Sequence, residues 1–265
     1  MPSPALVLAA AVALSPAVAR AGEAPCWFEH GVVVAPAVVV GVAGDFIVDT
    51  GSPATLLHDT RAQGAGISGE AVRGDVRLAG LTARDRPVQV ISLDSRTYAF
   101  DTPIAGVIGA DVLSGHVLDV SFAPCRLSLR APGRAGRFRA LAELPFLGPG
   151  GGPPVVRAAV SDGPSARSGG FVAATGAAAP VRLSDRAAAA AGTGAEPAAL
   201  YPEGSARAQL RALSFAGALD QFLGAGLVRA GDLPPGAIGV IGGPVLGRHR
   251  LRFDFPRGRL LVGAP

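Results

Sequence analysis

The sequence predicts a mainly β protein built from two related halves, with short helices between the strands. Three observations lead to this prediction: apolar residues are spread along the whole chain, short segments alternate between apolar and polar residues, and two distant segments are nearly the same. Alternation of period two is typical of strands that bury one face, and it recurs at Val76–Leu78, Val88–Val90 and Leu127–Leu129. A chain of 265 residues allows one large domain or two small ones.

The repeated segments begin at Gly106 and Gly239. The first reads Gly-Val-Ile-Gly-Ala-Asp-Val-Leu and the second Gly-Val-Ile-Gly-Gly-Pro-Val-Leu, and eleven of the 24 positions from each start are identical. Upstream, Phe46–Ser52 aligns with Phe171–Ala177 at nearly the same offset. Self-similarity at a constant offset is the signature of a repeated structural unit, so we interpret the chain as an internal duplication.

The duplication sets the expected domain boundaries. Residues 22–131 form the first lobe and residues 154–265 the second. Residues 132–153 form a linker rich in Pro and Gly, because the run from Gly148 to Pro154 suits neither a helix nor a central strand.

Within each lobe we expect the same order of elements. Short apolar strands precede a tight Thr-Gly turn, a short helix follows, and a pair of apolar strands ends the lobe. The helices are expected at Asp59–Gln63 and Asp185–Ala191, the second with Ser184 as its N-cap. The segments Gln209–Leu219 and Gln221–Val228 could form either short helices or strands.

Residues 1–21 predict an export signal peptide. An apolar run from Ala5 to Leu14 precedes Ala19-Arg20-Ala21, which has the A-x-A form of a signal-peptidase site. The run is too short to cross a bilayer, and no other apolar run reaches the roughly 18–20 residues that a span needs. We therefore expect a periplasmic or secreted protein whose mature chain has no integral membrane span.

Export would determine the oxidation state of the two cysteines. In an oxidising compartment an even pair of cysteines is more often bridged than free, so we expect a disulfide between Cys26 and Cys125. The alternative, a catalytic thiol, has no local nucleophile signature in its favour.

The positive net charge of +4 does not indicate nucleic acid. All 24 basic residues are Arg, and Ala, Gly, Pro and Arg dominate the chain, as coding in a GC-rich bacterial genome would produce. Arg248, Arg250 and Arg252 alternate with other residues, which predicts a strand with its arginine face in water, and an acidic partner is the alternative use of that face. No His, Cys and Asp cluster has metal-ligand spacing, so we expect neither a metal nor a cofactor.

One motif contains a candidate catalytic carboxylate. Asp49-Thr50-Gly51-Ser52 follows an apolar strand, and Val107-Ile108-Gly109 follows about 60 residues later. Taken alone, the first motif could be a plain β-turn, but with the repeat and the export signal the chain resembles aspartic peptidases of the pepsin and retropepsin type. The resemblance covers most of the mature chain. It implies a bilobal acid-protease β-barrel fold, a cleft between the lobes and Asp49 as a catalytic carboxylate.

The resemblance also implies roles for the neighbours of Asp49. Thr50 and Thr175 would cross-link the two loops, Gly51 would allow the sharp turn, and Ser52 would donate a hydrogen bond to the outer oxygen of Asp49. Tyr98 lies 49 residues after Asp49, where the family carries a flap over the substrate, and a packed aromatic residue is the alternative.

The second half departs from the family pattern. Ala174 stands where the second aspartate would be, and Ala177 stands at the Ser position, whereas Thr175 and Gly176 are kept. In the family mechanism two close carboxylates share a proton, so that one activates water while the other donates a proton. A monomer of this chain would bring only Asp49 to the interface.

Two functions are therefore expected for a protein whose ligand is a peptide or an unfolded protein. Two first lobes could pair as a homodimer, bring Asp49 against Asp49 and hydrolyse peptides. Alternatively the second lobe occupies that surface, and the protein is a catalytically silent pseudo-peptidase that binds extended peptides by strand addition.

Overall fold

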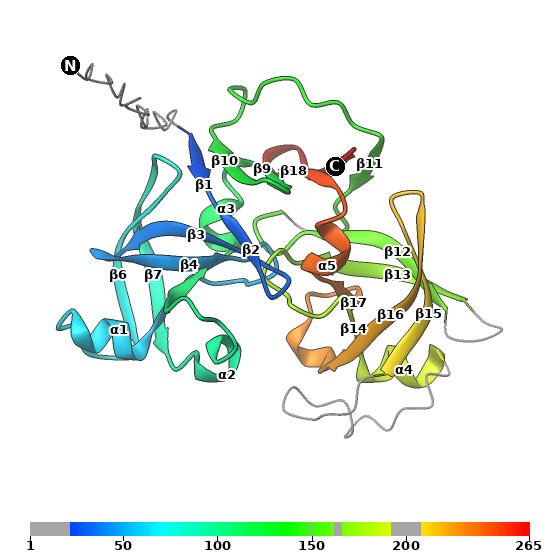
Figure 1. The fold of residues 1–265 in the computed structure, drawn as a ribbon, viewed down its shortest axis with the longest axis horizontal. Coiled ribbons are helices and arrows are strands. Elements are labelled where there is room, and N and C mark those ends of the chain that lie inside the picture. The colour runs from blue at the N-terminus through cyan, green and yellow to red at the C-terminus, as the bar shows by residue number, and fades with distance from the viewer. Residues whose placement is uncertain (1–21, 149, 162–165, 192–207) are drawn as a thin grey trace, which may run out of the picture.

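The computed structural model describes residues 22–148, 150–161, 166–191 and 208–265. The expected export signal over residues 1–21 lies outside this part of the chain. The described chain confirms the predicted bilobal, mainly β fold: one lobe is drawn in blue and cyan, the other in green to orange, and a third sheet lies above both (Figure 1).

The first lobe is a six-stranded barrel with one extra strand. The pairing of β3 with β6 closes the order β3-β4-β8-β5-β7-β6, and β2 pairs with the outer side of β3. Its strands are β2 (Trp27–Glu29), β3 (Val32–Val39), β4 (Val42–Val48), β5 (Leu56–His58), β6 (Ala71–Leu78), β7 (Leu81–Ile91) and β8 (Ile104–Ile108).

The second lobe is a closed barrel that repeats this topology. Its order β12-β13-β17-β14-β16-β15 matches the first lobe strand for strand. The two segments that the sequence left open between helix and strand form β15 and β16. The strands are β12 (Val155–Ser161), β13 (Ala166–Ala173), β14 (Val181–Ser184), β15 (Ala208–Phe215), β16 (Ala218–Val228) and β17 (Ala237–Ile241).

The helices of the described chain are short connections between strands. The expected helices form at α1 (Asp59–Gly64) and α4 (Asp185–Ala191), and the backbone N–H of Ala187 donates to Ser184 Oγ at 3.1 Å, which makes Ser184 the cap. No helix in the described ranges is long and apolar enough to cross a membrane. The remaining helical segments are α2 (Asp94–Thr97), α3 (Ala110–Leu113), α5 (Gly243–Leu246) and two 3-10 turns, Ala230–Asp232 and Phe255–Arg257.

A third sheet takes strands from both lobes. Its order is β1-β10-β9-β18-β19-β11, so each lobe supplies a hairpin and the two hairpins meet at β9 and β18. One edge strand, β11, lies within residues 132–153, the segment that was expected to be a linker rich in Pro and Gly. The strands are β1 (Glu23–Pro25), β9 (Val117–Phe122), β10 (Cys125–Arg130), β11 (Ala142–Pro145), β18 (Arg250–Asp254) and β19 (Arg259–Gly263).

The repeated glycines are explained by the cores of the barrels. Phe46 and Phe171 occupy equivalent positions and are completely buried. A Cβ atom on Gly106 would lie 2.8 Å from the Phe46 ring, and one on Gly239 would lie 2.8 Å from the Phe171 ring. The carbonyl oxygens of Leu56 and Arg182 on the neighbouring strands would be closer still, at 2.2 and 2.5 Å. Each glycine therefore makes room both for the neighbouring strand and for the aromatic side chain that fills its barrel.

The two hairpins of the third sheet are joined by a buried ion pair. Arg252 on β18 faces Asp119 on β9, and its Nε and Nη2 atoms donate to the two carboxylate oxygens at 2.5 and 2.7 Å. The two side chains are only 8% and 14% exposed. Arg252 also donates to the Gly136 carbonyl at 2.7 Å and lies over the Phe138 ring.

The expectation that the arginine face of this strand lies in water is thus wrong for Arg252. Residues 136–138 cover the strand, and Asp119 neutralises the buried charge. The positions of the pair are also repeat equivalents, because they are separated by the same 133 residues as Gly106 and Gly239.

The expected disulfide is confirmed. Cys26 lies between β1 and β2, and it is bonded to Cys125 at the start of β10 across 99 residues of sequence. It fastens the N-terminal segment of the described chain to the third sheet.

Removal of one partner of the buried ion pair is expected to destabilise the protein strongly. Asp119→Ala leaves the Arg252 guanidinium buried without its carboxylate, so the free energy of unfolding should fall by about 3–5 kcal/mol. Urea titration measures the change. The exchanged variant Asp119→Arg/Arg252→Asp should recover most of the loss, and the exposed Arg73→Ala control should lose far less. A loss no larger than that of the control would contradict the structural role of the pair.

Removal of the disulfide should also destabilise the fold. Cys26→Ala/Cys125→Ala frees a long loop in the unfolded chain, so the free energy of unfolding should fall by about 2–5 kcal/mol. Thermal and urea unfolding of the variant under non-reducing conditions give the value. Treatment of the wild type with dithiothreitol should produce a comparable loss, and the variant should not respond to it.

Candidate functional site

Each lobe presents one loop where two parallel strands end. The backbone N–H of Asp49 after β4 donates to the Ile108 carbonyl at the end of β8 at 3.0 Å, and Ala174 after β13 makes the same bond to Ile241 of β17 at 2.9 Å. Adjacent parallel strands end at the same edge of a sheet. The Asp-Thr-Gly motif and the Val-Ile-Gly motif are therefore spatial neighbours although about 60 residues separate them in sequence.

The glycine of each Val-Ile-Gly motif lies directly under the chain that follows the loop. A Cβ on Gly109 would lie 2.5 Å from the Ala54 carbonyl oxygen, and one on Gly242 would lie 2.0 Å from that of Ala179. Neither position has room for a side chain, so both lobes keep the glycine.

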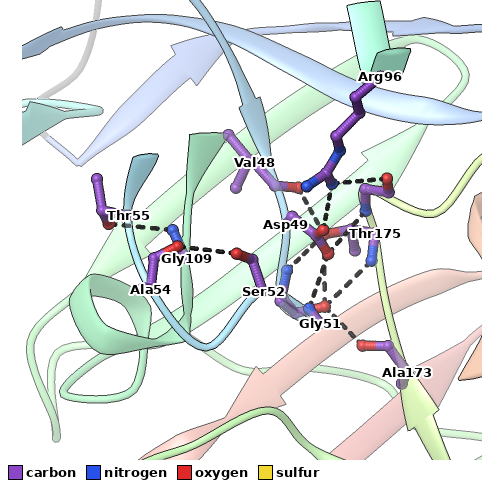
Figure 2. A network of polar contacts seen from close by, with 12 residues as sticks. Val48, Asp49, Gly51, Ser52, Ala54, Thr55, Arg96, Gly109, Ala173 and Thr175 are labelled. Atoms are coloured by element: carbon purple, nitrogen blue, oxygen red, sulfur yellow. Dashed lines mark hydrogen bonds and ion pairs between the residues drawn. The ribbon is translucent and has the colours of Figure 1, made fainter. Parts of the chain in front are cut away.

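Two threonines join the first loop (residues 49–52) to the second loop (residues 174–177). The Thr50 hydroxyl accepts from the Thr175 backbone N–H and the Thr175 hydroxyl from that of Thr50, both at 3.1 Å. Thr50 Oγ1 donates to the Ala173 carbonyl at 2.6 Å, and Thr175 Oγ1 to that of Val48 at 2.7 Å (Figure 2). Both side chains are completely buried, so the bonds form a reciprocal cross-link without competing water.

The two loops approach each other closely on both sides of this cross-link. A Cβ on Gly176 would lie 2.4 Å from Asp49 Cβ, and a Cβ on Gly51 would lie 2.4 Å from Ala174 Cβ. Each glycine thus accommodates the residue at the aspartate position of the other lobe. Asp49 of the first loop and Ala174 of the second occupy equivalent positions, so the two loops bring one carboxylate to this contact.

Hydrogen bonds occupy both oxygens of the Asp49 side chain, and the residue is only 5% exposed. The inner oxygen, Oδ1, accepts from the backbone N–H groups of Gly51 at 2.8 Å and Gly176 at 3.2 Å. The outer oxygen, Oδ2, is bound by the Nη2 atom of Arg96, which also donates to the Gly176 carbonyl at 3.0 Å (Figure 2). The guanidinium of Arg96 therefore bridges the first-lobe carboxylate and the second loop.

Ser52 does not take the role that the resemblance implied. Its hydroxyl donates to the Ala54 carbonyl at 2.8 Å instead of to Asp49 (Figure 2). The outer oxygen of Asp49 is bound by an arginine in its place.

Helix α2 holds Arg96 over the site. Leu93, which precedes the helix, is buried in the apolar cluster that includes Ile47. Asp94 in the first turn pairs through Oδ1 with His58 Nε2 at 3.2 Å. Sequence reasoning missed Arg96, because it belongs to no motif and lies 47 residues from the carboxylate that it binds.

A second arginine lies close to these charges. Arg182 stands on β14 between the buried residues Val181 and Leu183, so its side chain leaves the opposite face of the strand. Burial lowers the pKa of Arg182, the Arg96 guanidinium lowers it further, and the Asp49 carboxylate raises it. Arg182 makes no hydrogen bond or ion pair with any other residue of the described ranges.

The strand pairing shows which first-lobe residue is equivalent to Arg182. Arg182 pairs with Val240 of β17, and Leu56 pairs with the equivalent Val107 of β8. The first lobe thus has a leucine where the second has a half-buried arginine.

Two further observations describe the surroundings of the site. Tyr98 at the end of α2 is 83% exposed, so it is not a packed aromatic residue. Among the described residues no group of three or more His, Cys, Asp or Glu side chains could hold a metal ion.

Comparisons with known proteins indicate the fold of this chain. No family model matches the chain, and no curated protein matches it. A solved structure, the aspartic proteinase from Irpex lacteus, matches with a TM-score of 0.56 and 15% identity, over 92% of this chain and 97% of that one. This similarity spans both lobes and agrees with the bilobal fold.

Loss of the threonine cross-link should weaken the contact between the lobes. Thr50→Val leaves the buried Ala173 carbonyl and the Thr175 N–H without partners, which should lower the free energy of unfolding by about 1–3 kcal/mol. The Thr50→Val/Thr175→Val variant should lose less than the sum of the two single variants, because both remove parts of one network. Chemical denaturation of all three, with the exposed Thr82→Val as the control, tests this. Additive losses would contradict a shared network.

Proposed function

We propose that this protein is a catalytically silent relative of aspartic peptidases that binds extended peptide segments between its two lobes. The observation that carries the proposal is the pairing of its one loop carboxylate, Asp49, with Arg96, opposite Ala174. The mechanism of aspartic peptidases needs two carboxylates that share a proton and hold a water between them. Here the second carboxylate is replaced by a methyl group, and a guanidinium holds the oxygen that would face the water.

A homodimer in which two first lobes pair would bring a second aspartate, the partner's Asp49, to the site. The buried Asp119–Arg252 pair weighs against it. In such a homodimer β9 would meet a second β9, so Asp119 would face Asp119 without an arginine, and two buried like charges repel each other. Within one chain the second lobe already covers this surface, so we propose a monomer of two lobes, residues 22–131 and 154–265, that act together.

Support for peptide binding comes from the fold and from the surface beside the site. The aspartic proteinase that the chain resembles in fold is named for its action on proteins, and the threonine cross-link that brings the two lobes together is complete. Tyr98 offers an exposed aromatic ring at the end of the helix that holds Arg96, and such rings bind apolar and peptide groups well. The Cys26–Cys125 disulfide supports export to an oxidising compartment, periplasmic or extracellular.

A cleavage assay tests the catalytic part of the proposal. Purified wild type, Asp49→Ala and Ala174→Asp are incubated with reduced, alkylated α-lactalbumin between pH 3 and pH 7, and the products are identified by mass spectrometry. We expect no more cleavage by the wild type than by Asp49→Ala. Cleavage that disappears with Asp49→Ala would overturn the silent assignment. Sedimentation of the wild type in the same buffers should give the mass of one chain.

A binding assay tests the other part. The same unfolded α-lactalbumin is immobilised, and surface plasmon resonance measures its affinity for the protein at pH 7. Tyr98→Ala should weaken binding about tenfold through loss of an aromatic contact. The matched control Leu141→Ala, which removes a 71% exposed apolar side chain elsewhere, should bind like the wild type. No binding by the wild type, or equal effects of both substitutions, would contradict binding at this site.

A further inference from the structure

We infer that the site between the lobes recognises a carboxylate group on its peptide ligand, and that Arg96 and Arg182 bind it. This inference rests on the proposed function, because it names the chemical group that the same site would select. The first loop contributes the Asp49 carboxylate, which Arg96 binds. Arg182 pairs with Val240 of β17, and Val240 packs against the cluster that contains Ala174, so the Arg182 side chain lies on the face of the second barrel that carries the second loop. Two guanidinium groups, one from each lobe, thus accompany one carboxylate. One positive charge is therefore left without a counter-charge in the described part of the site.

The excess charge lies on the second lobe. Arg96 is already shared between Asp49 Oδ2 and the Gly176 carbonyl. Arg182 makes no hydrogen bond or ion pair with another described residue, although it lies in an apolar strand where the first lobe has Leu56. A half-buried guanidinium without an acceptor loses part of its hydration and gains nothing in return, so an incoming anion is favoured there.

The chemistry of arginine points to a carboxylate as that anion. A guanidinium presents its N–H donors in a planar fork that matches the two oxygens of a carboxylate, and such pairs form strong bidentate bonds. Ala174 leaves the second lobe without the carboxylate of its own that would face this surface. A carboxylate on the ligand would thus supply from outside the negative charge that the second loop lacks.

The carboxylate on an extended peptide can come from two sources, its C-terminus or an acidic side chain. Four dansylated hexapeptides of Ala, Val and Leu separate them: one with a free C-terminus, one with a C-terminal amide, one amide with a central Glu and one amide with a central Gln. Fluorescence anisotropy measures their affinities for the full protein at pH 7 in dilute buffer. We expect at least one of the two acidic peptides to bind about tenfold more tightly than its neutral counterpart.

Variants of the protein test whether Arg182 causes the preference for acidic over neutral peptides. Arg182→Leu, which copies the first-lobe residue at this strand position, should reduce the preference for acidic over neutral peptides to about twofold or less. Arg182→Lys should keep part of the preference, because the charge stays and the fork is lost. Arg126→Leu, which removes an equal charge from an exposed position on β10, should keep all of it. Thermal unfolding of each variant confirms that it is folded.

The outcomes separate the two proposals. Equal affinities for acidic and neutral peptides in the wild type would overturn the carboxylate inference and leave peptide binding intact. A preference for acidic peptides that survives Arg182→Leu, or one that disappears with Arg126→Leu, would also overturn the carboxylate inference and leave peptide binding intact. No binding of any of the four peptides would overturn the proposed function, and this inference with it.

Discussion

The reciprocal hydrogen bonds between Thr50 and Thr175 fix the positions of the two loops at the centre of this molecule. Each hydroxyl accepts from the backbone of the other loop and donates to the strand behind that loop, so neither lobe can shift without breaking buried bonds on both sides. This contact brings Gly176 against Asp49 and Gly51 against Ala174. It also brings the Gly176 carbonyl within reach of Arg96, so the arginine can bind both lobes at once.

The second loop keeps the residues that join the lobes and carries no charged side chain of its own. Thr175 forms the cross-link and Gly176 accommodates Asp49, whereas the position equivalent to Asp49 is Ala174. Arg96 and Arg182 therefore outnumber Asp49 among the charged side chains around the two loops. In the peptide site that we propose, this excess of positive charge determines which ligands are attracted, and the single loop carboxylate limits which reactions could be catalysed.

Much of the fold could be predicted from the sequence because the repeat and the strand alternation are local patterns. The disulfide could be predicted from an even pair of cysteines together with the expectation of export. Arg96 could not be predicted, since its contact with Asp49 depends on how Leu93 and Asp94 pack helix α2. The burial of Arg252 could not be predicted from the sequence either. Alternation shows which residues share a face of a strand, but it does not show which other segment covers that face. Gly136 and Phe138 provide that cover, and they belong to a segment that was expected to be a linker.

The buried pair of Asp119 and Arg252 has a consequence for how the two halves can assemble. The two residues occupy equivalent positions of the halves and face each other where β9 meets β18. Two copies of the first half would place two aspartates there, and two copies of the second half would place two arginines, in each case as buried like charges. The halves are therefore complementary at this contact, and each fits the other better than it fits a copy of itself.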